Sequence, residues 1–94
     1  MSDSILITIP HAWCWLDILE SDKGKYAIVN DVFVDLGYRN KGVGSQLIEK
    51  VIAKAKELNC YKVICTSRFS NKSAHRLYMK YFDIWGLEYR LDLE

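Results

Sequence analysis

A short basic and glycine-rich run is the part of this sequence best suited to chemistry. It joins an extended hydrophobic segment to an amphipathic helical pattern, and it reads Arg39-Asn40-Lys41-Gly42-Val43-Gly44. Glycine has no Cβ, so main-chain N–H groups at this junction can approach a ligand closely. The first N–H groups of the following helix lack intrahelical partners and carry partial positive charge. The run therefore predicts an anion site, and a pyrophosphate is the anion we expect.

Two better-known glycine motifs do not fit this run. A nucleoside-triphosphate loop would extend from Gly37 to Gly42 and continue with lysine, but position 43 is valine. A dinucleotide fingerprint would need a third glycine where Leu47 stands. Both interpretations are therefore excluded. A simpler alternative stays open, in which the two glycines of the run only form a tight turn.

The run places a basic residue before Gly-x-Gly at a strand-to-helix turn. This pattern resembles the phosphate-binding motif of the GNAT (Gcn5-related N-acetyltransferase) family. The similarity extends from Val34 to Ile48. A second segment resembles the family's second cofactor segment, and it reads Asn71-x-x-Ala74-x-x-Leu77-Tyr78-x-Lys80. Together the two motifs cover about residues 30–82. The resemblance implies the family's fold and acetyl-coenzyme A (acetyl-CoA) as cofactor.

The resemblance also implies which residues bind that cofactor. The strand that ends at Val34 is expected to splay away from the strand over residues 61–66. The pantetheine arm is expected to insert between them and to bond the main chain of Val32 and Val34. The same two valines also fit ordinary core positions. Asn71 is expected to bond the pantetheine arm as well. The residues expected around the pyrophosphate are Arg39, Asn40, Lys41, Gly42, Val43, Gly44 and Ser45.

Acetyl transfer to an amine needs a proton donor for the departing thiolate. Tyr78 matches the family's tyrosine in that role, and a phenol with a pKa near 10 suits an alkyl thiolate of similar basicity. Tyr78 also fits a packing position on the apolar side of its helix. Asp31 is the expected general base and Glu20 the second choice, although an aspartate near a turn is often solvated or a cap.

Other polar residues carry weaker signals. Arg68, Lys72 and Arg76 lie around the start of the second helical pattern, where the resemblance implies the adenosine 3′-phosphate; such residues are otherwise ordinary surface. His11 and His75 lack partner ligands at metal spacing, so no metal site is expected.

Composition narrows the class of protein. The 94 residues are expected to form a single GNAT-like domain over residues 1–94, with half of the residues apolar and 13% aromatic. A net charge of +1 argues against a nucleic-acid binder. The odd number of cysteines matches neither a disulfide framework nor a zinc site. With no signal sequence or membrane span, we expect a cytoplasmic protein without membrane partners.

Hydrophobic periodicity predicts an α/β (α+β) domain with a mixed, mostly antiparallel twisted sheet and two main helices. Apolar residues at helical spacing predict one helix from Gly44 to about Leu58. A second helix is expected from an N-cap at Ser70 or Asn71 to about Tyr81. The expected strands are residues 4–9, 12–20, 25–34, 61–66 and 87–93.

The sequence departs from the family in two places. Only about thirty residues precede the first motif, so the family's N-terminal strand and two helices, which form much of the acceptor pocket, are expected to be absent. Tyr81-Phe82-Asp83 also stands where the family has a hydrophobic-Gly-Phe helix end. The second departure leaves the helix end open.

The leading hypothesis is an acetyl-CoA-dependent N-acetyltransferase that acts on a primary amine. An acceptor on a protein, a lysine or an N-terminus, is favoured because the acceptor wall is short. The alternative is a CoA-binding, non-catalytic sensor or partner-dependent subunit, and nucleic-acid binding is the weakest hypothesis. A homodimer is favoured because a free strand edge and the aromatics Trp13, Trp15 and Trp85 need cover, although these tryptophans also suit a core.

Overall fold

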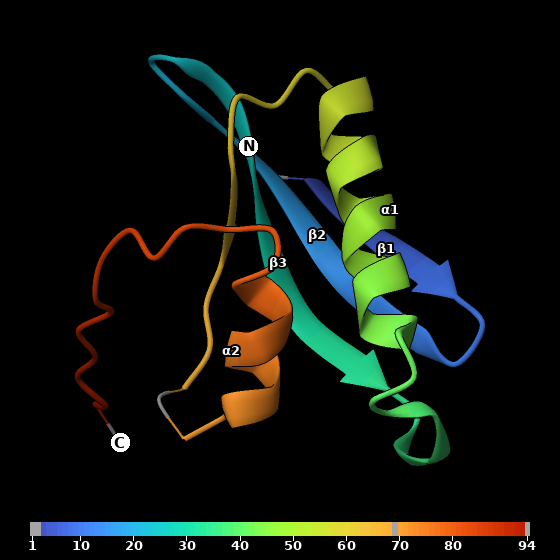
Figure 1. Cartoon of the computed structure of the whole chain (residues 1–94). Helices are drawn as coiled ribbons and strands as arrows, with labels where there is room; N and C mark the ends of the chain where they lie inside the picture. Colours follow the sequence, from blue (N-terminus) through green and yellow to red (C-terminus); the bar gives the residue numbers. More distant parts are fainter. Residues whose placement is uncertain (1–2, 69, 94) are drawn as a thin grey trace.

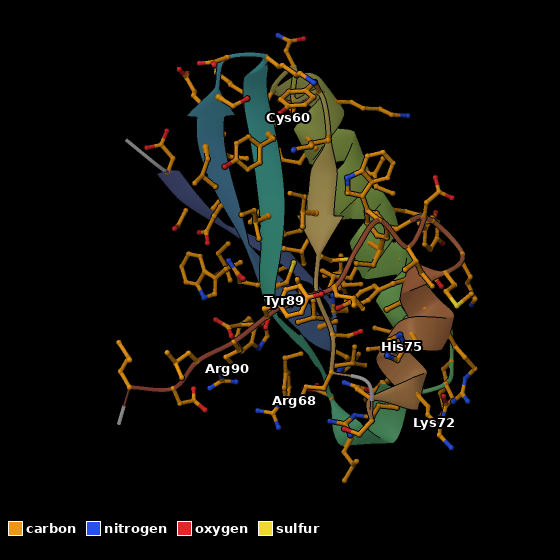
Figure 2. The ribbon with its side chains drawn as sticks, turned by 90° about the vertical axis from the view of Figure 1, so that its left-hand side faces the viewer. Cys60, Arg68, Lys72, His75, Tyr89 and Arg90 are labelled. Carbon is orange, nitrogen blue, oxygen red and sulfur yellow. The ribbon has the colours of Figure 1, made fainter. Side chains whose placement is uncertain are left out.

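A four-stranded sheet carries both helices on one of its faces (Figures 1 and 2). The computed structural model describes residues 3–68 and 70–93. The sheet order is β1-β2-β3-β4, antiparallel except for the parallel pair β3–β4. This confirms the predicted mixed, mostly antiparallel sheet with two main helices. The elements are β1 (Asp3–Ile9), β2 (Ala12–Ser21), β3 (Gly24–Val34), the 3-10 turn η1 (Leu36–Tyr38), α1 (Val43–Glu57), β4 (Val63–Cys65) and α2 (Lys72–Tyr78).

Alternation along the strands decides which face the helices cover. In β2 every second side chain from Ala12 to Ile18 is buried, and those between them are half-buried or exposed. α1 presents a matching apolar stripe at helical spacing. Burial of apolar surface is the main favourable term in folding, so it holds the stripe against this face. The buried cluster consists of Ile7, Ala12, Cys14, Leu16, Ile18, Ala27, Val29, Leu47, Val51 and Ala55.

The opposite face of the sheet has no covering layer among residues 3–68 and 70–93. Leu6, Trp13, Trp15 and Phe33 each expose between 37% and 48% of their surface there. The rings of Trp13 and Phe33 stack with centroids 5.7 Å apart. Of the two alternatives that the sequence left open for Trp13 and Trp15, the structure therefore favours surface over core.

β3 contains one more residue than the β2 segment it pairs with. Trp15 pairs with Asn30 and Trp13 with Phe33, which leaves two β3 residues opposite Cys14. Asp31, the first of the two, has a left-handed backbone with φ 55°. This is a β-bulge, and it shifts the alternation by one position. As a result, the valines at positions 29, 32 and 34 all face the helix-covered side.

The strands β3 and β4 part at this bulge. Their parallel pairing ends where Val29 lies opposite Cys65, while β3 continues to Val34. No strand of the described chain pairs with residues 30–34 on the β4 side. The separation that the resemblance implied between these strands is therefore present.

Two predicted boundaries and one predicted strand need correction. The strand predicted over residues 61–66 covers only Val63–Cys65. The second helix ends at Tyr78 rather than Tyr81, because the amides of Tyr81 and Phe82 both donate to the Tyr78 carbonyl and turn the chain out of the helix. The strand predicted over residues 87–93 was wrong, since residues 82–93 have no regular structure. A strand needs a hydrogen-bonded neighbour as well as an alternating pattern.

Candidate active site

The glycine run forms a tight connection between the end of β3 and the start of α1. Gly42 is the residue before α1, with a left-handed backbone at φ 81°, and Asn40 also has a positive φ of 61°. A Cβ on Gly42 would meet no atom within 4 Å. Glycine is thus favoured at this position by its backbone angle rather than by lack of space.

Gly44 has a different reason to be glycine. A Cβ there would lie 3.0 Å from Leu77 Cδ2, so its absence lets α2 pack against the first turn of α1. Two side-chain contacts continue this packing: Lys80 Nζ donates to Ser45 Oγ at 3.5 Å, and the Tyr81 hydroxyl donates to Glu49 Oε2 at 2.7 Å. The sequence interpretation considered Gly44 for ligand access or for a tight turn and missed its contact with α2.

The first amides of α1 are free to receive an anion. The Gln46 amide donates to the Gly42 carbonyl at 3.1 Å, and this is the first main-chain bond of the helix. Gly42 provides no side-chain cap, and no described residue accepts a hydrogen bond from the amides of Val43, Gly44 or Ser45. Three unpaired N–H groups at the positive end of a fifteen-residue helix are a suitable cradle for phosphate.

A histidine at the β1–β2 turn braces this connection. The His11 carbonyl accepts from the Asp35 amide at 2.8 Å, and His11 Nδ1 lies 3.2 Å from Asp35 Oδ2. The imidazole stacks on the Tyr38 ring with centroids 3.5 Å apart and planes 6° apart. Lys41 Nζ lies 5.8 Å from the centroid of the same ring. The sequence interpretation treated His11 as an ordinary histidine, because its neighbours depend on strand register.

The basic side chains of the run are exposed. Arg39 Nε donates to the Val34 carbonyl at 3.2 Å, which ties the run back to the end of β3. Arg68, Lys72 and Arg76 are exposed too. Figure 2 shows Arg68 and Lys72 at the same end of the molecule as the turn that follows β3. This end therefore carries the cations expected around a phosphate-bearing ligand.

Tyr78 is half-buried near the point where β3 and β4 part. Burial raises the pKa of its phenol to about 12, with smaller contributions from the Cys65 and Cys14 thiols. Cys65 ends β4 and Cys14 lies opposite the bulge, so the Tyr78 side chain lies in the neighbourhood of both cysteines. The phenol packs edge-on against Phe82, with centroids 6.1 Å apart. At neutral pH the group is protonated, and its raised pKa makes it a weaker acid than the phenol of pKa near 10 that the sequence interpretation matched to an alkyl thiolate.

Asn71 and His75 both stabilise the start of α2. Asn71 is the N-cap, and its Oδ1 accepts from the Ala74 amide at 3.1 Å. The His75 ring donates through Nε2 to the Arg68 carbonyl at 2.9 Å. The predicted N-cap is confirmed, and capping leaves the amide nitrogen of Asn71 for a ligand. His75 thus stabilises the loop before α2. The described residues contain no group of three metal-ligating side chains.

The two carboxylates considered as general bases lie in different places. Asp31 is exposed in the bulge, beside the separation of the strands. Glu20 pairs with Lys25 near the far end of the sheet, about 20 Å along the strand from Asp31 at ~3.3 Å per residue. Of the two carboxylates, Asp31 therefore lies nearer the opening.

Comparison with known proteins identifies the family of this chain. The Acetyltransferase (GNAT) family model matches residues 8–83, more than half of the chain. Streptothricin acetyltransferase A of Bacillus subtilis (strain 168) is 35% identical over 68 residues, which cover 72% of this chain and 39% of that protein. The chain belongs to the GNAT family. GNAT acetyltransferases use acetyl-CoA and an amine acceptor.

Solved GNAT structures have the same fold over most of this chain. Glucosamine-6-phosphate N-acetyltransferase from Arabidopsis thaliana superposes with a TM-score of 0.74 at 23% identity, over 89% of this chain and 58% of that one. An acetyltransferase of Trypanosoma brucei gives 0.74 at 32% identity, over 87% and 58%. This GNAT chain thus spans less than two thirds of the length of these relatives. None of the helices in the described ranges is long and apolar enough to cross a bilayer.

Proposed function

We propose that this GNAT chain transfers the acetyl group of acetyl-CoA to a primary amine. The observation that carries the proposal is the position of Tyr78, a protonated phenol near the point where β3 and β4 part. The unpaired amides of α1 lie on the helix against which α2 packs. In acetyl-CoA, the diphosphate suits the unpaired amides of α1, and the thioester suits the phenol of Tyr78.

The cofactor residues proposed from the resemblance fit this arrangement. The amides of residues 40–45, with the side chains of Arg39 and Lys41, hold the pyrophosphate. The main chain of Val32 and Val34 bonds the pantetheine arm, because residues 30–34 have an edge that no strand of the described chain occupies. The free amide nitrogen of Asn71 adds a donor. The bound donor supplies an activated acetyl group as a thioester.

The chain's own groups then move two protons. The acceptor nitrogen forms a bond to the acetyl carbon as the carbon–sulfur bond breaks, and Tyr78 gives its proton to the departing thiolate. The amine loses a proton to Asp31, which is exposed beside the opening. Burial favours the neutral phenol, so Tyr78 regains its proton after product release.

Substitution of Tyr78 by phenylalanine tests the acid role. Tyr78→Phe keeps the ring that packs on Phe82, so binding of acetyl-CoA measured by calorimetry should be retained. Turnover, measured as thiol release, should fall by about 10²–10⁴-fold. Tyr81→Phe is the matched control, because that hydroxyl bonds Glu49 instead. Equal turnover in both variants would remove Tyr78 from the mechanism, and no binding by the unaltered protein would end the proposal.

A second candidate function is a CoA-binding, non-catalytic sensor or partner-dependent subunit. It is favoured by the exposure of Asp31, which leaves the base without a fixed environment. It predicts that acetyl-CoA binds, that no amine is acetylated by the protein alone, and that Tyr78→Phe changes nothing measurable. Thiol release with and without a panel of amines separates the two functions.

We propose a protein lysine or N-terminus as the acceptor. The open face of the sheet exposes the aromatic side chains of Trp13, Trp15 and Phe33, and an exposed apolar surface suits a large partner. One relative, N-alpha-acetyltransferase 30 of Xenopus laevis, is 42% identical over 45 residues, 48% of this chain and 16% of that protein. A screen of peptides, polyamines and aminoglycosides for acetyl-dependent mass shifts tests this proposal. Modification of small amines only would refute it.

We also propose that the protein is a cytoplasmic homodimer. Cys14, Cys60 and Cys65 are free thiols, the usual state in a reducing compartment. Trp85, Leu91 and Leu93 are 98%, 82% and 88% exposed, and large exposed apolar side chains can serve an interface between copies. Sedimentation at micromolar concentration distinguishes a dimer from a monomer.

A further inference from the structure

Three polar side chains are joined by hydrogen bonds on the open face of the sheet, the face that α1 and α2 leave uncovered (Figure 1). Ser4 Oγ donates to Asp17 Oδ1 at 2.6 Å, and Asn30 Nδ2 donates to Asp17 Oδ2. Asp17 and Asn30 are half-buried. Within residues 3–68, Asp17 is the only charged residue among the paired strand positions of this face. The mechanism proposed above uses none of these three side chains.

The carboxylate of Asp17 fixes the orientation of the Asn30 amide. A carboxylate only accepts hydrogen bonds, so the amide must present its nitrogen to Asp17. The amide oxygen lies on the other side of Cγ and is therefore turned away from β2. No described residue donates a hydrogen bond to Asn30 Oδ1, and no side-chain polar atom of the described residues is both buried and unpaired. Asn30 Oδ1 is thus open to a ligand that donates a hydrogen bond.

Asn30 lies at the opening between β3 and β4. The last paired residues of these strands are Val29 and Cys65, so Asn30 is the first residue of β3 beyond the pairing. Both helices cover the other face of the sheet (Figure 1), so a ligand can approach from the face that carries Asp17 and Asn30. The thioester is proposed at the same opening. A nucleophile bound to Asn30 would therefore lie beside the acetyl group.

The surroundings of the Asn30 amide suit an amine on an apolar stem. Trp15 pairs with Asn30 in the sheet and is 38% exposed, and Leu6, its neighbour on β1, is 48% exposed. Methylene groups gain free energy when they pack on such side chains, and a cation is attracted to the face of an indole ring. The charge of Asp17 is opposite to that of an ammonium group. A lysine side chain combines the four-carbon stem with this charge.

We propose that the Ser4–Asp17–Asn30 network binds the amine end of an acceptor lysine, whose methylene stem lies on Trp15. Asn30 accepts a hydrogen bond from the amine, while Asp17 holds the Asn30 amide in place and attracts the cation. The inference rests on the proposed function and narrows its acceptor to lysine. An N-terminal amine fits less well, because its nitrogen is bonded directly to Cα and has no stem.

Two matched peptides test this site by calorimetry. One carries lysine and the other norleucine, which has the same four-carbon stem without the amine, and CoA replaces acetyl-CoA so that no acetyl transfer occurs. The unaltered protein should bind the lysine peptide at least about 10-fold more tightly. Asp17→Asn and Asn30→Leu should each reduce this preference to about threefold or less, and the double variant should reduce it little further, because the two residues act as a unit.

A third substitution tests the stem separately from the amine. Trp15→Thr should weaken both peptides alike, by about fourfold for each methylene that loses its cover. Asp22→Asn is the control for loss of charge, because this carboxylate lies in the turn between β2 and β3, and it should leave the preference unchanged. CoA affinity should be the same in all of these variants.

The remaining outcomes separate this site from the enzyme function. Equal binding of the two peptides by the unaltered protein would overturn the inference. So would a full preference in Asp17→Asn and Asn30→Leu, because a network that only stabilises the sheet would lower resistance to urea without changing the preference. Turnover of acetyl-CoA with the lysine peptide is measured on the same samples. Turnover together with a full preference in both variants would keep the enzyme and remove this site. A preference that both variants lose, without turnover, would support the site in a non-catalytic subunit.

Discussion

Gly44→Ala tests whether contact between α1 and α2 assembles the site. The added methyl would lie 3.0 Å from Leu77 Cδ2, against ~3.5–4.0 Å for ordinary carbon contacts. Overpacking of this kind costs about 1–3 kcal/mol, while alanine favours a helix over glycine by about 1 kcal/mol. The single variant should therefore lie between neutral and about 2 kcal/mol destabilised. With Leu77→Ala also present, the clash disappears, and Gly44→Ala should stabilise by up to about 1 kcal/mol.

Urea unfolding of the four proteins measures this coupling. The effects of Gly44→Ala with and without Leu77 should differ by about 1–3 kcal/mol. Because Leu77 precedes Tyr78, the single variant should also weaken acetyl-CoA turnover. Gly37→Ala is the control, since a Cβ there meets no atom within 4 Å, and it should change stability by less than about 0.5 kcal/mol. Additive effects within about 0.5 kcal/mol would show that α2 does not depend on this contact.

Two further predictions follow from the site. Burial raises the pKa values of Cys14 and Cys65 from 9.0 to about 11 and that of Tyr78 from 10.0 to about 12, so stability from these groups is fully present below pH 9 and is lost as pH rises to 11–12. Denaturant unfolding from pH 8 to 11 should show this loss of unfolding free energy. In Cys14→Ala the loss should be smaller by up to about 2.7 kcal/mol. The same pH dependence in the variant and the unaltered protein would contradict the prediction. His11→Ala removes the stacking on Tyr38 and the contact with Asp35, so calorimetry should show about 3–10-fold weaker acetyl-CoA binding with kcat unchanged. Asparagine tolerates the positive φ of 70° at this position, so His11→Asn should recover part of that loss. Unaltered binding in His11→Ala would mean that the His11 side chain does not support the anion site.

Local periodicity was enough to predict most of the elements. Leu47, Val51 and Ala55 recur at helical spacing, and these residues are the buried stripe of α1. Alternation in β2 likewise matches the observed burial from Ala12 to Ile18. Both patterns are local, because 3.6-residue and 2-residue repeats follow from backbone geometry alone.

Features that depend on a distant partner were not predictable in this way. The bulge at Asp31 contains no glycine, and its presence depends on how β2 and β3 pair around Cys14. The segment 87–93 has the alternation of a strand, yet it pairs with nothing in the described chain. Tyr78 packs on Phe82, which is one of its two predicted behaviours, and its role as an acid stays a prediction.

The sequence by itself determined the glycine run, the helix after it and the family, because each is encoded in residues close together along the chain. Only the tertiary structure showed that Gly44 must be small to let α2 pack on α1. It also showed that His11 contacts Asp35 and Tyr38, and that β3 and β4 separate at the bulge. These three depend on contacts with Leu77, Asp35 and Cys14, residues that lie far away in sequence. Spacing specifies which side chains share a face, but only the packed register specifies which faces meet.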